Sequence, residues 1–150
     1  MRITKRANIA MRLLMFCAAS DGHLVTKAEI ALRCNTSPSH LAQIVNRLAQ
    51  LGFLRTQRGR TGGITLARPA AQIRVGEVFR RLEENTPVAE CFADADNTCP
   101  LVAACRLRVA LADAVEAFYA QLDEISLDAL VCDNTALFAV FSIGACPQRS

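Results

Sequence analysis

The stretch TKAEIALRCNTSPSHLAQIVNRLAQ, residues 26–50, contains two helix starts separated by a short polar turn. Thr26 and Glu29 form the T-x-x-E pattern of a capping box, which predicts the start of a first helix. Ser37 is a suitable N-cap for a second helix, and Pro38 occupies its first position, where a missing N–H does no harm. Apolar residues then recur every three or four positions. Two helices joined by a short turn predict a helix-turn-helix.

The residues that follow predict a β-hairpin. FLRTQ (53–57) and ITLAR (64–68) have the composition of strands, and RGRTGG (58–63) has that of a turn. A hairpin directly after a helix-turn-helix makes a winged helix. Arg58 and Arg60 lie at its tip among glycines, where arginine can reach phosphates or a narrow minor groove. A merely solvated basic hairpin is the alternative interpretation.

Helical spacing of apolar residues continues on both sides of this unit. It predicts a helix over 4–19, and a linker at 69–73 that leads to a short amphipathic helix at 75–84. A short helix is expected at 126–130. Residues 101–122 predict the longest helix, which is rich in alanine and suits a dimer interface, with packing inside the chain as the alternative. The expected fold class is mostly α with a small β-hairpin wing: a winged helix-turn-helix plus a long dimerisation helix.

Charge is distributed unevenly along the chain. Residues 1–83 contain 14 Lys and Arg against 4 Asp and Glu, whereas residues 84–150 contain 3 against 10. The net charge of +3 therefore combines about +10 with about −7. A basic half favours a polyanion partner such as a nucleic acid, and an ordinary solvated surface is the alternative.

The hydropathy pattern argues against a membrane protein. No unbroken apolar run reaches the ~18 residues of a membrane span, and the longest candidate, 137–143, is far too short. The N-terminus is basic and then apolar, as in a signal peptide. However, Arg12 interrupts the apolar run and polar residues follow where a cleavage site is expected. We therefore expect a cytoplasmic protein without a membrane partner.

Three of the seven cysteines lie close together. Cys91, Cys99 and Cys105 follow the spacing C-x7-C-x5-C. Structural zinc prefers closer pairs, whereas iron–sulfur clusters accept wider spacings on loops. On one straight helix Cys99 and Cys105 would point ~240° apart, so a shared site requires irregular backbone, which Pro100 favours. A redox disulfide and three free thiols in a polar loop are the alternatives.

Three thiols leave one iron of a cluster without a complete ligand set. The fourth ligand must then come from elsewhere, such as a second subunit. An iron with a weak ligand is open to small molecules, which is what a sensor needs. The other cysteines are scattered, and we do not expect them to bind the cluster: Cys17, Cys34, Cys132 and Cys146.

Together these motifs resemble the winged-helix iron–sulfur transcriptional regulators over about residues 1–140. The segments that carry the resemblance are MRITKRANIAMRLLMFCA (1–18), HLAQIVNRLAQLGFL (40–54), RGRTGGITLARPA (58–70), IRVGEVFRRLE (73–83) and the cysteine stretch. Within the family, the sequence is most similar to the nitric-oxide-sensing repressors of the NsrR type. These are related to the RirA-type iron regulators and to the IscR-type regulators of cluster biogenesis.

The resemblance implies a homodimeric repressor of double-stranded DNA with a palindromic operator. It implies an iron–sulfur cluster, 4Fe–4S rather than 2Fe–2S, on Cys91, Cys99 and Cys105. In NsrR-type members the fourth ligand is an aspartate from the partner's first helix, and this chain has Asn8 there, whose neutral oxygen is a weaker ligand. It also implies two groups of DNA-binding residues. Those expected to read base edges in the major groove are Ser37, Ser39, His40 and Gln43. Those expected to enter the minor groove are Arg58 and Arg60.

We therefore expect three regions: 1–84, a winged helix-turn-helix DNA-binding domain; 85–106, a cluster-binding loop; and 107–150, a dimerisation helix and C-terminal tail. The expected function is a transcriptional repressor that senses nitric oxide through a labile cluster. An iron- or cluster-status sensor of the same family and a metal-free thiol redox switch are the alternatives. Nothing in the sequence offers a nucleophile–base pair, a phosphate loop or a substrate pocket, so we do not expect an enzyme.

Overall fold

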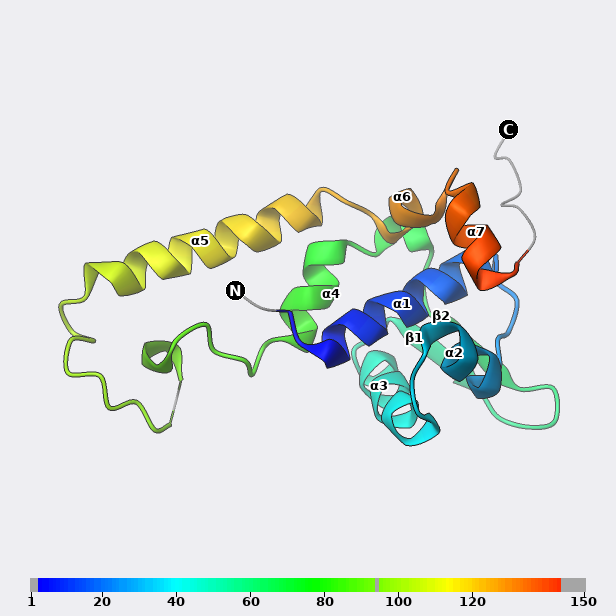
Figure 1. The fold of residues 1–150 in the computed structure, drawn as a ribbon, viewed down its shortest axis with the longest axis horizontal. Helices are drawn as coiled ribbons and strands as arrows, with labels where there is room; N and C mark the ends of the chain where they lie inside the picture. Colours follow the sequence, from blue (N-terminus) through cyan, green and yellow to red (C-terminus); the bar gives the residue numbers. More distant parts are fainter. Residues whose placement is uncertain (1–2, 94, 144–150) are drawn as a thin grey trace.

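The computed structural model describes residues 3–93 and 95–143. Seven α-helices, two short 3-10 helices and a two-stranded hairpin form along these residues. Figure 1 shows α5 extending away from a compact body that the other helices and the hairpin form. The elements in chain order are α1 (Lys5–Ala19), α2 (Lys27–Cys34), α3 (Pro38–Gln50), β1 (Leu54–Gln57), β2 (Gly63–Leu66), η1 (Ala70–Gln72), α4 (Val75–Leu82), η2 (Glu90–Phe92), α5 (Arg106–Asp123), α6 (Leu127–Val131) and α7 (Thr135–Phe141).

The helix starts are capped by the residues that the sequence pattern indicates. The Thr26 hydroxyl accepts from the Glu29 N–H at 3.3 Å, and the Glu29 carboxylate accepts from the Thr26 N–H at 2.7 Å, which completes the capping box of α2. Ser37 accepts from the backbone N–H of His40 at the start of α3. Asn35 adopts a left-handed conformation (φ 49°) that ends α2 and turns the chain into α3.

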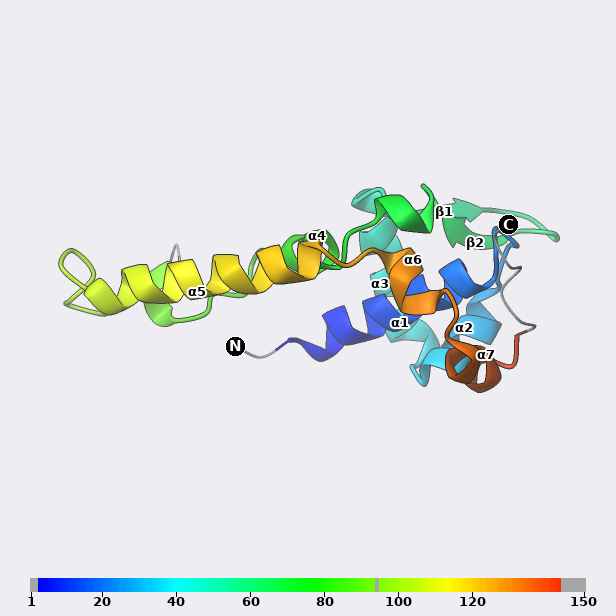
Figure 2. The same ribbon diagram turned by 90° about the horizontal axis from the view of Figure 1, so that it is seen from above.

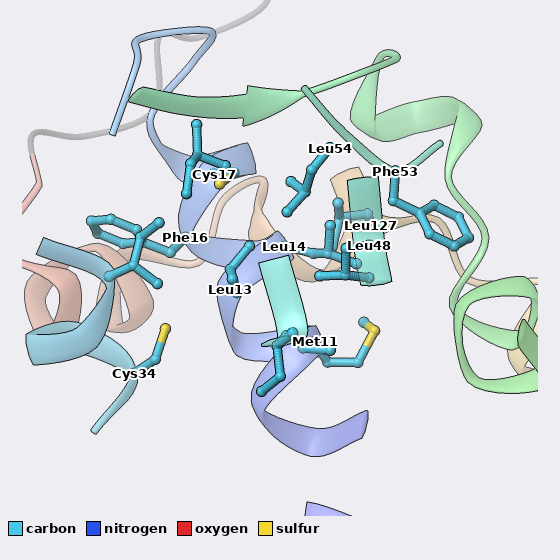
Figure 3. Packing of buried hydrophobic residues seen from close by; sticks show 14 of the residues in the cluster. Met11, Leu13, Leu14, Phe16, Cys17, Cys34, Leu48, Phe53, Leu54 and Leu127 are labelled. Atoms are coloured by element: carbon cyan, nitrogen blue, oxygen red, sulfur yellow. The ribbon is translucent and has the colours of Figure 1, made fainter. Parts of the chain in front are cut away.

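A single apolar core joins the N-terminal helices, the wing and the C-terminal helices. Figure 3 shows Leu13 and Leu14 of α1 packed with Leu48 of α3, Phe53 before β1 and Leu127 of α6. These five side chains are almost completely buried. Burying a residue of this size stabilises the fold by about 1.5–3 kcal/mol, so this core fixes α3 relative to α1.

The wing is an antiparallel hairpin anchored at its base. The register pairs Leu54 with Leu66 and Gln57 with Gly63. Val25, just before α2, exchanges two backbone hydrogen bonds with Ile64 of β2, at 3.0 and 2.8 Å. The base of the wing is therefore attached to the helix-turn-helix, and only the loop between the strands projects from the body (Figure 2).

The segment expected as a linker at 69–73 is ordered and packed. Residues 70–72 form η1, and Ile73 is completely buried. The Leu127 N–H donates to the Ile73 carbonyl at 2.8 Å, and the Val75 N–H donates to the Ile125 carbonyl at 2.9 Å. Residues 73–75 therefore pair with residues 125–127 at the start of α6. The local composition of 69–73 does not reveal this pairing.

The C-terminal helices return to the body. α6 packs against α1, and Phe141 of α7 meets Phe16 of α1 edge-to-face with 5.1 Å between ring centroids. α7 was not expected from the sequence, although Asn134 caps it by accepting from the Leu137 N–H at 3.1 Å. The tail at 144–150, including Cys146, lies outside the described residues.

The fold class is confirmed: the molecule is mostly α with a small β-hairpin wing on a helix-turn-helix, and it has one long helix. The start expected for that helix was wrong. Residues 101–104 form a turn, in which the Ala104 N–H donates to the Leu101 carbonyl, and Cys105 is extended (φ −81°, ψ 106°). Alanine favours a helix wherever one forms but does not fix its first residue, so α5 begins at Arg106.

Candidate functional site

The start of α3 presents a row of polar side chains. Ser37, Ser39 and Gln43 are exposed, and His40 is partly buried. The Ser37 and Ser39 hydroxyls lie 3.4 Å apart, and Ser37 also holds the His40 N–H. These four residues are the base-reading residues that the family resemblance implies, and they lie at the N-terminal end of one helix, as recognition in a major groove requires.

The wing loop presents Arg58 and Arg60, both exposed. Gly59 adopts φ +113°, a backbone conformation that side chains rarely accept. A side chain at Gly62 would collide with the carbonyl oxygen of Gln57, while the Gly62 N–H donates to the Gly59 carbonyl at 3.0 Å. The glycines therefore allow a tight loop that carries two guanidinium groups away from the body.

A hollow of about 830 Å³ lies between α3 and the wing. It brings together Gln43 and Asn46 of α3, Gln57 and Arg58 of the wing, and Lys27 at the start of α2. Sequence reasoning missed Lys27, Asn46 and Gln57 because they lie on three different elements. The hollow has two cations and three side-chain amides on its walls, which are groups that bind phosphate oxygens and base edges.

The three clustered cysteines lie on irregular backbone around the outer end of α5. Cys91 lies in η2, Cys99 lies in a segment that is neither helix nor strand, and Cys105 is the residue just before α5. All three thiols are free and partly exposed. Among residues 3–93 and 95–143, no group of three or more His, Cys, Asp or Glu side chains stands close enough to hold a metal ion. The chain thus brings the three cysteines into one segment without assembling them into a finished site.

Two of the remaining described cysteines differ from these three in burial. Cys17 and Cys34 are buried. Burial raises the pKa of Cys17 to about 12 and that of Cys34 to about 11, so both stay protonated and inert near neutral pH. Both therefore pack as small residues of the apolar core. Cys132 is partly buried and its thiol donates to Asp128 at 3.8 Å.

Asn8 lies on the exposed side of α1, about one turn from its start. In both ribbon views the cysteine segment lies at the outer end of α5, away from α1 (Figures 1 and 2). One chain therefore does not bring Asn8 to its own cysteines.

A polar network joins α5 to α4. Arg80 donates to Asp123 at 2.9 Å and to Glu116 at 3.0 Å, and its guanidinium lies 5.0 Å from the ring centroid of Tyr119. A side chain at Gly76 of α4 would collide with α5, so the two helices are in close contact. The hydrogen bond and the charge of Asp123 raise the pKa of Arg80, so the guanidinium stays positively charged.

The network continues from α4 to α1. Glu83, at the end of α4, is buried, and its carboxylate accepts from the Thr4 backbone N–H at 3.0 Å and from the Thr4 hydroxyl at 2.7 Å. Thr4 in turn caps α1 by accepting from the Ala7 N–H. Burial raises the pKa of Tyr119, and the nearby charge of Glu83 raises it further. Contacts between residues so far apart in the sequence had no sequence signal.

The helix-turn-helix, the anchored wing and the exposed polar face of α3 define a winged-helix transcriptional regulator. Comparison with known families identifies which one: residues 3–133 match the model of the Rrf2 family, described as iron-dependent transcriptional regulators. The chain belongs to the Rrf2 family. It is a regulator rather than an enzyme, since its relatives are named transcriptional regulators.

Two curated relatives are similar along most of their length. The HTH-type transcriptional regulator NsrR of Geobacillus kaustophilus (strain HTA426) is 43% identical over 138 residues, which cover 91% of this chain and 94% of that relative. The HTH-type transcriptional repressor NsrR of Streptomyces coelicolor (strain ATCC BAA-471 / A3(2) / M145) is 42% identical over 138 residues, or 90% of this chain and 91% of that relative.

A solved structure shares the fold. The structure described as T. potens IscR superposes with a TM-score of 0.67 at 21% identity, and covers 87% of this chain and 85% of that one. Among the described residues, no helix combines the length and apolar character needed to cross a bilayer.

The donor set of the cysteine segment fits an iron–sulfur cluster in kind. Thiolates are the ligands such clusters prefer, and the three thiols are free, partly exposed and carried on irregular backbone. The segment supplies three ligands per chain. Cys91, Cys99 and Cys105 would therefore hold the group, with a fourth ligand from outside the segment.

Proposed function

We propose that this protein is a dimeric transcriptional repressor that senses nitric oxide through an iron–sulfur cluster on Cys91, Cys99 and Cys105. The observation that carries the proposal is the pairing of two features in one chain. One is a winged helix whose α3 exposes a polar reading face at its N-terminal end, and the other is a group of three free thiols around the outer end of α5. The NsrR-named relatives, similar over nine-tenths of the chain, support a repressor. When bound, a cluster supplies iron that reacts with nitric oxide.

The exposure of α5 supports a homodimer. α5 contains no buried residue, although it is the longest helix. Leu107 and Val109 are 65% and 62% exposed, and Phe118 is 37% exposed. A long helix with exposed apolar side chains gains free energy by packing against a second copy, because those side chains then leave water.

A dimer also offers a fourth ligand. Asn8 is exposed on α1 and remote from its own chain's cysteine segment (Figure 1). If α5 pairs with its counterpart, the outer end of each α5 points toward the partner's body. The Asn8 side chain would then reach the partner's cysteines. Its carbonyl oxygen is neutral, so we infer that this ligand is weak and that the site is open to small molecules.

The DNA-binding role follows from the reading face and the wing. Ser37, Ser39, His40 and Gln43 would read base edges in the major groove. Arg58 and Arg60 would enter the flanking minor groove, which is most negative where A·T pairs narrow it. Two copies related by a two-fold axis would bind a palindromic operator with half-sites ~10 bp apart.

The contacts between helices offer a route from the cysteines to the DNA. Cys105 directly precedes α5, and Arg80 attaches α5 to α4 through Asp123. Glu83 attaches α4 to the start of α1, and α1 packs on α3. A change in the cysteine segment that moves α5 would therefore move the recognition helices of the two subunits relative to one another.

The test of the proposal is the cluster itself. We expect anaerobically purified protein to show a visible absorption band, and to contain iron and sulfide. Changing Cys91, Cys99 or Cys105 to alanine should each remove both, whereas Cys17→Ala, Cys34→Ala and Cys132→Ala should retain them. Full iron and sulfide occupancy in any of the first three variants would exclude the ligand assignment.

Two further measurements, of disulfide formation and of DNA affinity, separate the alternatives. A colourless wild-type protein that forms a disulfide on mild oxidation would favour a thiol redox switch on the same cysteines. A coloured protein whose DNA affinity follows iron supply but not nitric oxide would favour a sensor of iron or cluster status.

A further inference from the structure

The cysteine segment contains two polar contacts that the proposed function does not use. They involve Glu90 and Arg108, which are adjacent to the cysteines in space but are not ligands. We propose that Glu90 and Arg108 are positioning residues, which hold the backbone at Cys91, Cys99 and Cys105 in a folded arrangement before any metal is bound. This inference rests on the proposed function, because it concerns the same three cysteines.

Glu90 connects the first and second cysteines. One oxygen of its carboxylate accepts from the Thr98 backbone N–H and from the Thr98 hydroxyl, the latter at 2.8 Å. Glu90 directly precedes Cys91, and Thr98 directly precedes Cys99. A side chain that joins residues 90 and 98 therefore closes the seven-residue interval between the two thiols.

The position of Cys99 is fixed locally as well. Its backbone N–H donates to the Asn97 side-chain carbonyl at 3.1 Å. This short turn, together with the contact of Glu90 with Thr98, leaves the backbone before Cys99 with few alternatives.

Arg108 connects the first and third cysteines. Its Nε–H donates to the backbone carbonyl of Cys91 at 3.0 Å, and its guanidinium lies 5.3 Å from the ring centroid of Phe92. Arg108 lies in the first turn of α5, three residues after Cys105. The arginine therefore holds the η2 turn, with Cys91, against the end of the helix that Cys105 precedes.

The two contacts together hold all three cysteines near one another. Glu90 and Thr98 join the residues before Cys91 and Cys99, and Arg108 joins Cys91 to the helix that follows Cys105. Each contact is exposed, so each contributes little to the stability of the whole fold. Their effect is on the segment: a free loop of this length loses conformational entropy when three of its residues bind one cluster. A segment that is already closed loses less.

The conservative variant distinguishes positioning from a structural role. Glu90→Gln keeps an acceptor oxygen for Thr98, whereas Glu90→Ala removes it. Arg108→Ala removes the donor to Cys91. Matched controls are Glu124→Gln and Arg106→Ala: both side chains are exposed, and neither has a side-chain hydrogen bond or ion pair within the described part of the chain.

The experiment measures amide hydrogen exchange across residues 95–105 in chelator-treated protein, and then iron and sulfide per chain after anaerobic reconstitution. We expect Glu90→Ala and Arg108→Ala to exchange about 2–10-fold faster in this segment, as the loss of one exposed hydrogen bond allows. Both should load less iron and sulfide, with no measurable change in Tm. Glu90→Gln and the controls should behave as wild type.

The outcomes separate this inference from the proposed function. Unchanged exchange and unchanged loading in Glu90→Ala and Arg108→Ala, with a loaded wild type, would overturn the positioning role alone. A wild type that takes up no iron would overturn the proposed function, while the exchange rates would still decide whether Glu90 and Arg108 order the segment.

Discussion

At the scale of single residues, the cysteines divide by environment. Cys17 and Cys34 lie in the core, where burial raises their pKa values to about 12 and about 11. Cys91, Cys99 and Cys105 are partly exposed. The thiolate is the reactive form, so Cys17 and Cys34 are expected to be unreactive near neutral pH.

This division predicts alkylation in the metal-free native protein. At pH 8, iodoacetamide should modify Cys91, Cys99 and Cys105, while Cys17 and Cys34 should react only after unfolding in urea. Peptide mass spectrometry measures each site separately. If Cys17 were labelled as fast as Cys99 in the native protein, the account of its burial would be wrong.

The same pKa values give stability a pH dependence. An unfolded thiol has a pKa of about 8.5, below the folded values of Cys17 and Cys34. Above roughly pH 8.5 the unfolded chain releases these protons before the folded one does. Their contribution therefore makes the free energy of unfolding fall as pH rises toward 11.

Residues that act locally could be predicted from the sequence, and those that act across the chain could not. Thr26 and Ser37 cap helices through neighbours three residues away, and the pattern alone indicated them. Glu83 and Thr4 are 79 residues apart, so their contact exists only after α1 and α4 have packed. The contact between Arg108 and Cys91 has the same character.

At the scale of elements, α1, α2 and α3 agree closely with the sequence prediction because each begins with a side-chain cap. α4 has no such cap, and the spacing of its apolar residues alone predicted it. The late start of α5 has a local cause. Its first turn has no side-chain cap, and Cys105 is extended. α7 was missed because its short sequence is apolar at nearly every position, so no helical period stands out. Its packing depends on the contact of Phe141 with Phe16.

The exposure of α5 predicts how the proposed dimer can be separated into single chains. Val109→Glu places a charge on an apolar face that is 62% exposed in the single chain, and burying that charge in an interface would be costly. We expect wild-type protein to sediment as a dimer and the variant to sediment as the 16.3 kDa chain. Analytical ultracentrifugation makes the measurement.

A matched control is available on the opposite side of the molecule. Leu32 on α2 is 74% exposed, and Leu32→Glu should remain dimeric. A Val109→Glu protein that still sediments as a dimer would assign the interface to a surface other than α5.

At the scale of the whole molecule, α5 joins the two ends of the structure to which we assign DNA binding and sensing. The reading face of α3 and the wing lie in the compact body, and the cysteine segment lies at the outer end of α5 (Figure 1). Arg80 and Glu83 connect α5, α4 and α1 in series. Allosteric coupling between distinct sites requires such a connected element with two arrangements, and pairing of α5 in a dimer would supply it.

The measurement that tests the central claim most directly is a DNA titration before and after nitric oxide. Anaerobic, cluster-loaded protein is titrated against its operator and a scrambled duplex at several salt concentrations. We expect tighter binding to the operator, and a loss of about 5–150-fold on nitric oxide treatment, the range of typical coupling energies. Equal affinity for both duplexes, or affinity unchanged by nitric oxide, would contradict the account of a nitric-oxide-sensing repressor.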